Sequence, residues 1–197
     1  MPVLTPSVLP VMKPSRTPAA DSPRPSIRAE YERHGPEEFY AVHGATYRNP
    51  HEKALHAALR RAVAEWPLDL GHVLDLACGS GEVTLALPEA RAIDGIDPHT
   101  AAAYRERTGK PAEPWTFDQI AGGALLDRRY TLIVCSFALH LIDPARLPVL
   151  AYQLGRIADT LLVLSPHKRP RMTLAWGWVE VDAMLVERVH TRLYKYA

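Results

Sequence analysis

The sequence predicts an α/β fold in which helices cover both faces of a mostly parallel sheet. Short apolar runs alternate with helical patterns through most of the 197 residues, as in βαβ units. The first complete unit joins its strand to its helix through a glycine-rich turn at residues 77–81. The C-terminal residues alternate like two half-exposed strands, which predicts an antiparallel hairpin.

The first clear helix begins at Asn49-Pro50-His51-Glu52. Asn49 can cap it, Pro50 suits the first position and Glu52 can reach back to the cap. Pro67 ends the helix. One apolar stripe is expected to face the sheet, formed by Leu55, Leu59, Ala62, Val63 and Trp66.

The remaining elements follow in alternation. The expected strands are 72–76, 92–96, a short one near 115–117, 130–135 and 160–164. The expected helices begin at about 81, span 99–108 before Gly109, and span about 145–157 after Asp143-Pro144. The hairpin strands are expected at 178–187 and 189–196.

Length and composition allow one domain with a sizeable core. Seven of the 18 prolines fall in the first 25 residues, so residues 1–26 are predicted to be a disordered tail, with a transit peptide as the alternative. The net charge is +1 without a dense basic block, which argues against nucleic acid as a partner. No apolar run approaches the roughly 18 residues of a membrane span. Two cysteines give no disulfide framework, so a cytoplasmic location is expected.

Residues 73–81, Val-Leu-Asp-Leu-Ala-Cys-Gly-Ser-Gly, predict a strand, a tight turn and the start of a helix. This layout lets backbone N–H groups approach a small ligand closely. Asp97 closes the next strand, sixteen positions after Gly81, where a carboxylate can bind the two hydroxyls of a ribose. A nucleoside-containing cofactor is therefore expected, although Asp97 can also serve as a simple helix cap.

The charges of the turn distinguish between cofactors. A dinucleotide fingerprint needs a third glycine or alanine where this chain has Thr84, and the charge of Asp75 would repel a pyrophosphate. The turn resembles the first motif, (D/E)-x-G-x-G-x-G, of the class I S-adenosylmethionine-dependent methyltransferases. Asp75-Leu-Ala-Cys-Gly79-Ser-Gly81 aligns with it, with Ala77 replacing the first glycine.

This resemblance covers about residues 70–197 and implies a Rossmann-like, mostly parallel seven-stranded sheet with a C-terminal antiparallel hairpin. Residues 70–197 would be the methyltransferase core and 27–69 an added N-terminal helical cap. The resemblance also implies S-adenosylmethionine as cofactor. Asp118 matches an acidic position that often binds the adenine amino group, with an ordinary turn residue as its alternative. The implied cofactor-binding residues are Asp75, Ala77, Cys78, Gly79, Gly81, Asp97, Pro98, Asp118, Gln119 and Ser136.

The run from Tyr130 to Asp143 resembles the fourth strand of that family and its exit loop. Ligands bind beyond the carboxyl ends of such strands, so Ser136, Phe137 and His140 are expected to face the methyl group and the acceptor. In-line methyl transfer needs alignment, and a base only if the acceptor must lose a proton. His140 is the candidate catalytic base; lining the pocket or a structural role are its alternatives.

Two further segments are candidates for acceptor binding. Tyr40, His43 and Tyr47 have the spacing of one helical face, which could close over the cavity or dock on the core. Arg48 could pair with the methionine carboxylate. His167 follows the fifth strand, and the neighbouring Lys168-Arg169 pair hints at an anionic acceptor; a solvated loop is the alternative.

The expected function is methyl transfer from S-adenosylmethionine to a small molecule, with a protein side chain as the alternative acceptor; neither a nucleic acid nor a membrane is an expected partner. The alternatives are a catalytically silent module with the same fold and an NAD-dependent oxidoreductase. Thr84, Asp75 and the absence of a Tyr-x-x-x-Lys pair argue against the oxidoreductase. The nine histidines are scattered without ligand-pair spacing, so no metal site is expected. The acceptor atom and the oligomeric state stay open.

Overall fold

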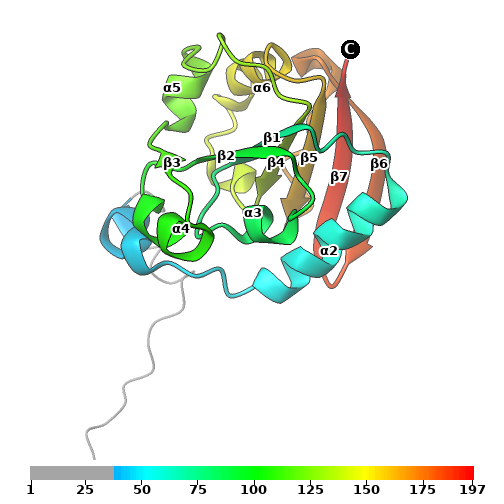
Figure 1. The fold of residues 1–197 in the computed structure, drawn as a ribbon. Helices are drawn as coiled ribbons and strands as arrows, with labels where there is room; N and C mark the ends of the chain where they lie inside the picture. Colours follow the sequence, from blue (N-terminus) through cyan, green and yellow to red (C-terminus); the bar gives the residue numbers. More distant parts are fainter. Residues whose placement is uncertain (1–37) are drawn as a thin grey trace, which may run out of the picture.

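A seven-stranded sheet runs through the centre of the computed structural model, which describes residues 38–197 (Figure 1). The strand order is β3-β2-β1-β4-β5-β7-β6. The pairs among β1 to β5 are parallel, whereas β7 is antiparallel to both of its neighbours. The strands are β1 (His72–Leu76), β2 (Ala92–Ile96), β3 (Ala112–Glu113), β4 (Leu132–Ser136), β5 (Thr160–Ser165), β6 (Trp178–Val186) and β7 (Val189–Tyr196). This arrangement confirms the predicted fold class.

Helices cover both faces of the sheet. In Figure 1, α5 and α6 lie above it and α2, α3 and α4 lie below it. The helices are α2 (Glu52–Glu65), α3 (Glu82–Ala86), α4 (Ala101–Thr108), α5 (Phe117–Ala121) and α6 (Leu147–Gly155). Three short 3₁₀ helices connect them: η1 (Gly44–Thr46), η2 (Leu139–Leu141) and η3 (Leu174–Trp176).

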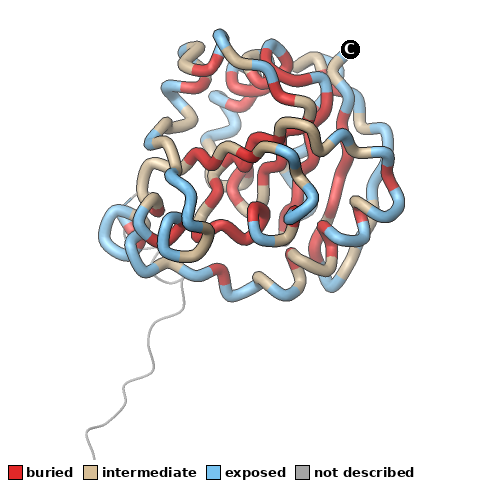
Figure 2. Tube along the Cα trace, in the orientation of Figure 1, coloured by how far each residue is buried: buried red, intermediate tan, exposed pale blue. Residues whose placement is uncertain are grey.

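Each face of the sheet has its own apolar cluster. Leu74 points to the cluster beneath α6, while its neighbour Val73 points to the cluster beneath α2, following the two-residue period of a strand. Because both faces are covered, the central strands are buried almost throughout (Figure 2). The stripe predicted for α2, including Leu55 and Leu59, packs in this second cluster.

Residues 38–69 contain two helical segments, 38–43 and α2. Of these, α2 packs in the same core as the sheet. The predicted tail at 1–26, and residues 27–37 of the predicted cap, lie outside the described residues. No helix within residues 38–197 is both long enough and apolar enough to span a membrane.

The start of α2 differs from its prediction. The Asn49 side chain accepts a hydrogen bond from His51 N (2.9 Å), but it does not cap the helix, and Glu52 pairs with Arg107 on α4 instead of reaching back. A charged partner brought close by the fold thus replaced the predicted local contact. The helix ends at Glu65, before Pro67 as expected.

The third strand was also placed wrongly. It lies at 112–113, not near 115–117, because Phe117 already begins α5. Thr116 accepts a hydrogen bond from Gln119 N (3.2 Å), and the Gln119 side chain accepts one from Thr116 N (2.9 Å). This capping box outweighs the strand propensity of the Trp-Thr-Phe run.

Candidate functional site

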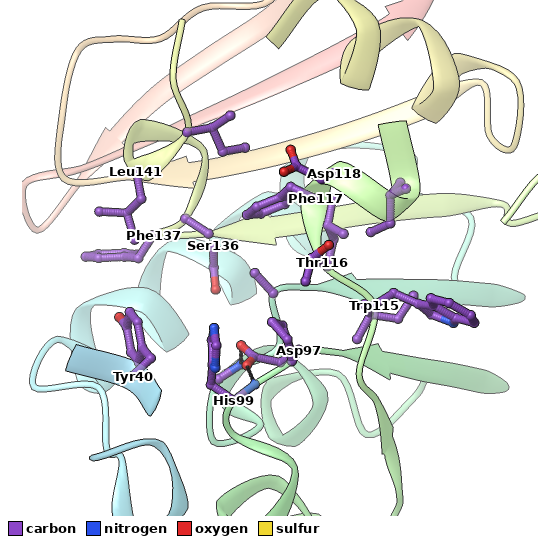
Figure 3. Close-up of a pocket in the computed structure, with 18 of the residues that line it drawn as sticks. Tyr40, Asp97, His99, Trp115, Thr116, Phe117, Asp118, Ser136, Phe137 and Leu141 are labelled. Atoms are coloured by element: carbon purple, nitrogen blue, oxygen red, sulfur yellow. Dashed lines mark hydrogen bonds between the residues drawn. The ribbon is translucent and has the colours of Figure 1, made fainter. Parts of the chain in front are cut away.

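A cavity of about 630 Å³ opens where the carboxyl ends of β1, β2 and β4 meet. Because β2 and β4 lie on opposite sides of β1, the order of the strands reverses direction at β1. Open parallel sheets bind ligands at such a switch point. Each of these strands contributes the residues that follow it to the cavity wall. They are Ala77 and Gly79 after β1, Asp97, Pro98 and His99 after β2, and Ser136, Phe137 and Ala138 at and after β4 (Figure 3).

The glycine-rich turn reaches the cavity through left-handed backbone. Ala77, Gly79 and Gly81 have φ angles of 57°, 55° and 90°. A Cβ on Gly79 would lie 3.1 Å from Glu82 Oε2 and 3.3 Å from a ring carbon of Tyr47, so a side chain here would be tightly packed as well as strained by the left-handed backbone. Alanine at 77 adopts the conformation despite a cost of roughly 1–2 kcal/mol. The turn therefore forms without the first glycine of the motif.

Asp97 joins the turn to the next helix. Its Oδ1 accepts hydrogen bonds from His99 N (2.9 Å) and Thr100 N (3.0 Å), which organises the start of α4. Its Oδ2 accepts one from Gly79 N (3.3 Å). The carboxylate also lines the cavity (Figure 3). Asp97 is therefore not the N-cap of α4, which is Thr100, but it fixes the turn that leads into the helix and also lines the cavity.

Asp75 lies elsewhere than predicted. Its side chain is fully buried and is not part of the cavity wall. Oδ2 accepts hydrogen bonds from Thr84 N (3.2 Å) and Thr84 Oγ1 (2.8 Å), so Asp75 fastens β1 to α3 beneath the turn. Burial raises its pKa to about 8. The expectation that its charge enters the turn is therefore wrong.

Two other predicted residues of the turn also lie off the wall. Cys78 is buried, and burial raises the pKa of its thiol, so its side chain is an inert part of the core. Gly81 packs against α4, where an added Cβ would lie 2.4 Å from a methyl carbon of Thr108. Their contribution to the cavity is through the path of the backbone.

The wall beside β3 and α5 contains Asp118, the residue expected to bind the adenine amino group. Trp115, Thr116, Phe117 and Asp118 line it (Figure 3). Asp118 is exposed and forms an ion pair with Arg146, which also lies on the wall. Gln119 does not line the cavity, because its side chain is used in the capping box of α5.

A buried charged network supports the turn from behind. Glu82 lines the cavity and accepts hydrogen bonds from Asn49 N (3.2 Å), Ser80 N (3.2 Å) and Arg107 Nη1 (3.1 Å). Arg107 also donates to Ser80 O (3.3 Å) and pairs with Glu52. One guanidinium thus connects α4, the turn and the start of α2. The sequence analysis did not single out this network, because its partners are up to 55 residues apart.

Aromatic side chains form the wall nearest Ser136. Tyr40 and Tyr47 line it with their rings 5.1 Å apart, edge to face. Phe137 lines it from a left-handed backbone with a φ of 55°, and its ring stacks on His51 at 5.7 Å. In Figure 3, Tyr40 and Phe137 lie on the opposite side from Trp115.

His43 and Arg48 do not join this wall. The helical segment ends at His43 and gives way to η1, so the single helical face predicted through Tyr47 does not form. The His43 ring packs 4.9 Å from that of Phe39. Arg48 lies 4.0 Å from Glu106 on α4.

His140 and His167 also lie off the cavity wall. Their rings pack 4.6 Å apart, and burial, followed by the charge of His167, lowers the pKa of His140 to about 4. Within residues 38–197, His99 is the histidine on the wall; its ring lies between Tyr40 and Asp97 (Figure 3). Sequence reasoning missed it, although its place two residues after Asp97 is a usable signal.

The charges on the wall favour a ligand with a cationic centre. Four carboxylates line the cavity, Glu82, Asp97, Asp118 and Asp143, against one guanidinium, that of Arg146. Residues 38–197 contain no group of three or more His, Cys, Asp or Glu side chains able to hold a metal ion.

Known proteins resemble this chain in sequence and in structure. No protein-family model matches it. It is 33% identical to the uncharacterized protein C17A5.05c of Schizosaccharomyces pombe over 228 aligned positions, which cover 86% of this chain and 92% of that protein.

Solved structures resemble it at lower identity. The N-methyltransferase NodS of Bradyrhizobium japonicum WM9, in complex with S-adenosyl-L-homocysteine, is 13% identical with a TM-score of 0.60, covering 79% of this chain and 96% of that one. The magnesium protoporphyrin IX methyltransferase of Synechocystis PCC 6803, with bound S-adenosylmethionine, is 15% identical with a TM-score of 0.57, covering 87% and 95%. The chain therefore belongs to the family of the S. pombe protein, and its fold is that of the class I S-adenosylmethionine-dependent methyltransferases.

Proposed function

We propose that this protein binds S-adenosylmethionine in the cavity at the carboxyl ends of β1, β2 and β4 and transfers its methyl group to a small molecule. The observation that carries the proposal is the hydrogen bond from Gly79 N to Asp97 Oδ2 (3.3 Å). It brings a glycine of the turn and a carboxylate together on one wall, as recognition of a nucleoside requires. A volume of about 630 Å³ lies within the range of small-molecule sites.

We assign the three portions of the cofactor to three parts of the cavity wall. Asp97 is suited to the ribose hydroxyls, and Thr116, Phe117 and Asp118 to the adenine. Ala77, Gly79 and Ser136 remain the proposed neighbours of the methionine portion. When bound, the cofactor supplies an activated methyl group. The excess of carboxylates over cations on the wall suits its sulfonium.

The chain's own residues would act mainly by alignment. Tyr40, Tyr47 and Phe137 enclose the end of the cavity near Ser136, where they can orient an acceptor and exclude water. His140 stays a proposed base without support from its position, because it is off the wall. A second candidate function follows from that position: a cofactor-binding module without turnover.

The experiment has a binding arm and a transfer arm. Calorimetry with S-adenosylmethionine and S-adenosylhomocysteine is expected to show binding that Gly79→Val weakens by more than about tenfold, since its side chain would collide with Glu82 and Tyr47. Gly109→Ala is the matched control: Gly109 is also left-handed, with a φ of 70°, but nothing lies within 4 Å of its added Cβ. This control is expected to bind both compounds like the wild type.

In the transfer arm, the wild type is incubated with methyl-labelled cofactor and metabolite extracts. Label appearing in a small molecule, and not with Gly79→Val, supports the enzyme. Binding without any transfer would select the silent module. Absence of binding of both compounds would refute both functions.

A further inference from the structure

The cavity combines aromatic rings with an excess of negative charge. Tyr40, Tyr47 and Phe137 line it, and Tyr40 and Phe137 lie on the side away from Trp115 in Figure 3. Aromatic faces attract cations electrostatically. Asp143 is an exposed carboxylate on the wall of the same cavity, and its Oδ1 accepts a hydrogen bond from Ala145 N (2.9 Å). The cavity is therefore suited to a positively charged group.

The charge excess persists when the supporting network is included. The four wall carboxylates face two guanidinium groups, Arg146 on the wall and Arg107 behind it. Arg146 is paired with Asp118, and Arg107 is shared between Glu82 and Glu52. S-adenosylmethionine has one net positive charge at neutral pH, so its binding leaves the cavity negative. An anionic acceptor would be repelled.

The basic pair that hinted at an anionic acceptor in the sequence lies elsewhere. Lys168 and Arg169 are both exposed, and neither is on the cavity wall. Within residues 38–197, the guanidinium that does reach the wall, that of Arg146, is already paired with Asp118. This basic pair therefore gives no support to an anionic acceptor in the cavity.

The transfer step itself distinguishes nitrogen from oxygen acceptors. A neutral nitrogen attacks the methyl carbon with its lone pair, the N–C bond forms, and the C–S bond breaks with its electron pair going to sulfur. The positive charge then moves from sulfur to nitrogen and stays inside the acidic, aromatic cavity. Transfer to a hydroxyl instead ends in a neutral ether and a lost proton. If the nitrogen arrives protonated, the imidazole of His99 on the same wall can take that proton first.

We infer that the methyl acceptor is a small nitrogen base, an amine or nitrogen heterocycle without an attached anionic group, held against the aromatic side chains of this acidic cavity. This inference rests on the proposed methyltransferase function.

The test compares three probes of similar size on protein saturated with S-adenosylhomocysteine: 2-phenylethylamine, 2-phenylethanol and 3-phenylpropanoate. Calorimetry is expected to show that the amine binds about tenfold more tightly than either of the others. Asp143→Asn should reduce this preference several-fold. Asp159→Asn is the matched control, because Asp159 is exposed and precedes β5 at the opposite end of the sheet.

The aromatic contribution is tested at Tyr40. Tyr40→Leu should weaken amine binding several-fold, whereas Tyr40→Phe, which keeps a ring, should retain most of it. The inference is overturned if the alcohol or the carboxylate binds as tightly as the amine, if the amine does not bind to the loaded protein, or if the Asp143 and Tyr40 variants leave its binding unchanged. Failure of S-adenosylhomocysteine to bind at all is a separate result, which refutes the proposed function and the inference with it.

Discussion

Asp97 shows how one side chain organises both backbone and cavity. One carboxylate oxygen binds two N–H groups at the start of α4 and the other binds Gly79 N. The same carboxylate remains on the cavity wall. Stabilising a turn and binding a ligand therefore need not be competing roles for an acidic residue after a strand, because a carboxylate has several acceptor sites.

Replacement of Asp97 can separate these roles. Asp97→Ala is expected to weaken S-adenosylmethionine binding about tenfold or more, because a charge-assisted hydrogen bond contributes about 1.5–3 kcal/mol. It should also lower stability by about 1 kcal/mol, because the hydrogen bonds to His99 N, Thr100 N and Gly79 N are lost. Asp97→Asn keeps an oxygen for His99 N and Thr100 N but sets an NH2 donor opposite Gly79 N, so it should lose less stability than Asp97→Ala while its affinity still falls.

Calorimetry and thermal unfolding measure the two effects. A folded Asp97→Ala protein with unchanged affinity would show that the carboxylate serves only to stabilise the backbone around it.

At the residue scale, sequence reasoning placed residues on the cavity wall correctly where their position depends on local backbone. Gly79 and Asp97 line the cavity as expected, because a glycine-rich turn and an acid after a strand leave a local pattern. Asp75 was misplaced because a motif letter does not tell which way a strand side chain points. His140 was misplaced because η2 (Leu139–Leu141) follows β4 and turns its ring against His167, away from the wall.

At the scale of elements, the turn, α2 and α4 are held together by Arg107. Its side chain is 11% exposed and that of Glu82 only 4%, so solvent screens this pair little. Glu82 accepts a hydrogen bond from Asn49 N, and both members of the pair bind Ser80. Asn49 lines the cavity, and Ser80 belongs to the glycine-rich turn. Arg107 does not line the cavity, so we expect it to act by positioning.

Arg107→Gln leaves the Glu82 carboxylate buried without its cation. Loss of one partner of a buried pair typically costs about 3–5 kcal/mol. We expect the free energy of unfolding to fall by about 3 kcal/mol and S-adenosylhomocysteine affinity to fall with it. Urea unfolding and calorimetry measure these quantities.

Two further variants sharpen the interpretation. Adding Glu82→Gln to Arg107→Gln removes the uncompensated charge, so part of the lost stability should return. Arg61→Gln is the control, because the Arg61–Glu65 pair is exposed on one helix face and is worth at most about 0.5 kcal/mol. Equal losses in the Arg107 and Arg61 variants would contradict the role of the network.

The positions of helices and strands could be predicted where the signal lies in the local sequence. The contacts at their ends could not be predicted where a residue distant in the sequence takes part. Apolar runs located β1 and β2, and Gly109, with its φ of 70°, marked the end of α4. The third strand was misplaced although the Thr116–Gln119 capping box that begins α5 is itself a local signal, whereas Glu52 pairs with Arg107, a distant residue, instead of the start of α2. The second of these contacts spans 55 positions and could not be read from spacing.

At the scale of the whole molecule, two buried groups make stability depend on pH in opposite directions. Burial raises the pKa of Asp75 to about 8 from an ordinary value of 3.8, so the folded protein binds its proton more tightly than the unfolded chain. Burial, followed by the charge of His167, lowers the pKa of His140 to about 4 from 6.5, so the unfolded chain binds that proton more tightly.

The slopes follow from these proton counts. Between pH 3.8 and 8, Asp75 makes stability fall as pH rises, by at most about 1.4 kcal/mol per pH unit. Between pH 4 and 6.5, His140 makes stability rise with pH, by less, because its ring is partly exposed to solvent. The two contributions oppose each other below pH 6.5, and that of Asp75 acts without the other between 6.5 and 8.

Variants that remove one titration at a time test this balance. Asp75→Asn keeps an oxygen that can accept from Thr84, so the fold should form, and stability should no longer decline between pH 6.5 and 8. His140→Gln should instead steepen the decline between pH 4 and 6.5. Urea unfolding across this range measures the slopes independently of any constant loss of stability from the substitution. Parallel curves for the wild type and Asp75→Asn would mean that Asp75 is ionised in the folded protein, with Thr84 and its surroundings stabilising the charge that burial disfavours.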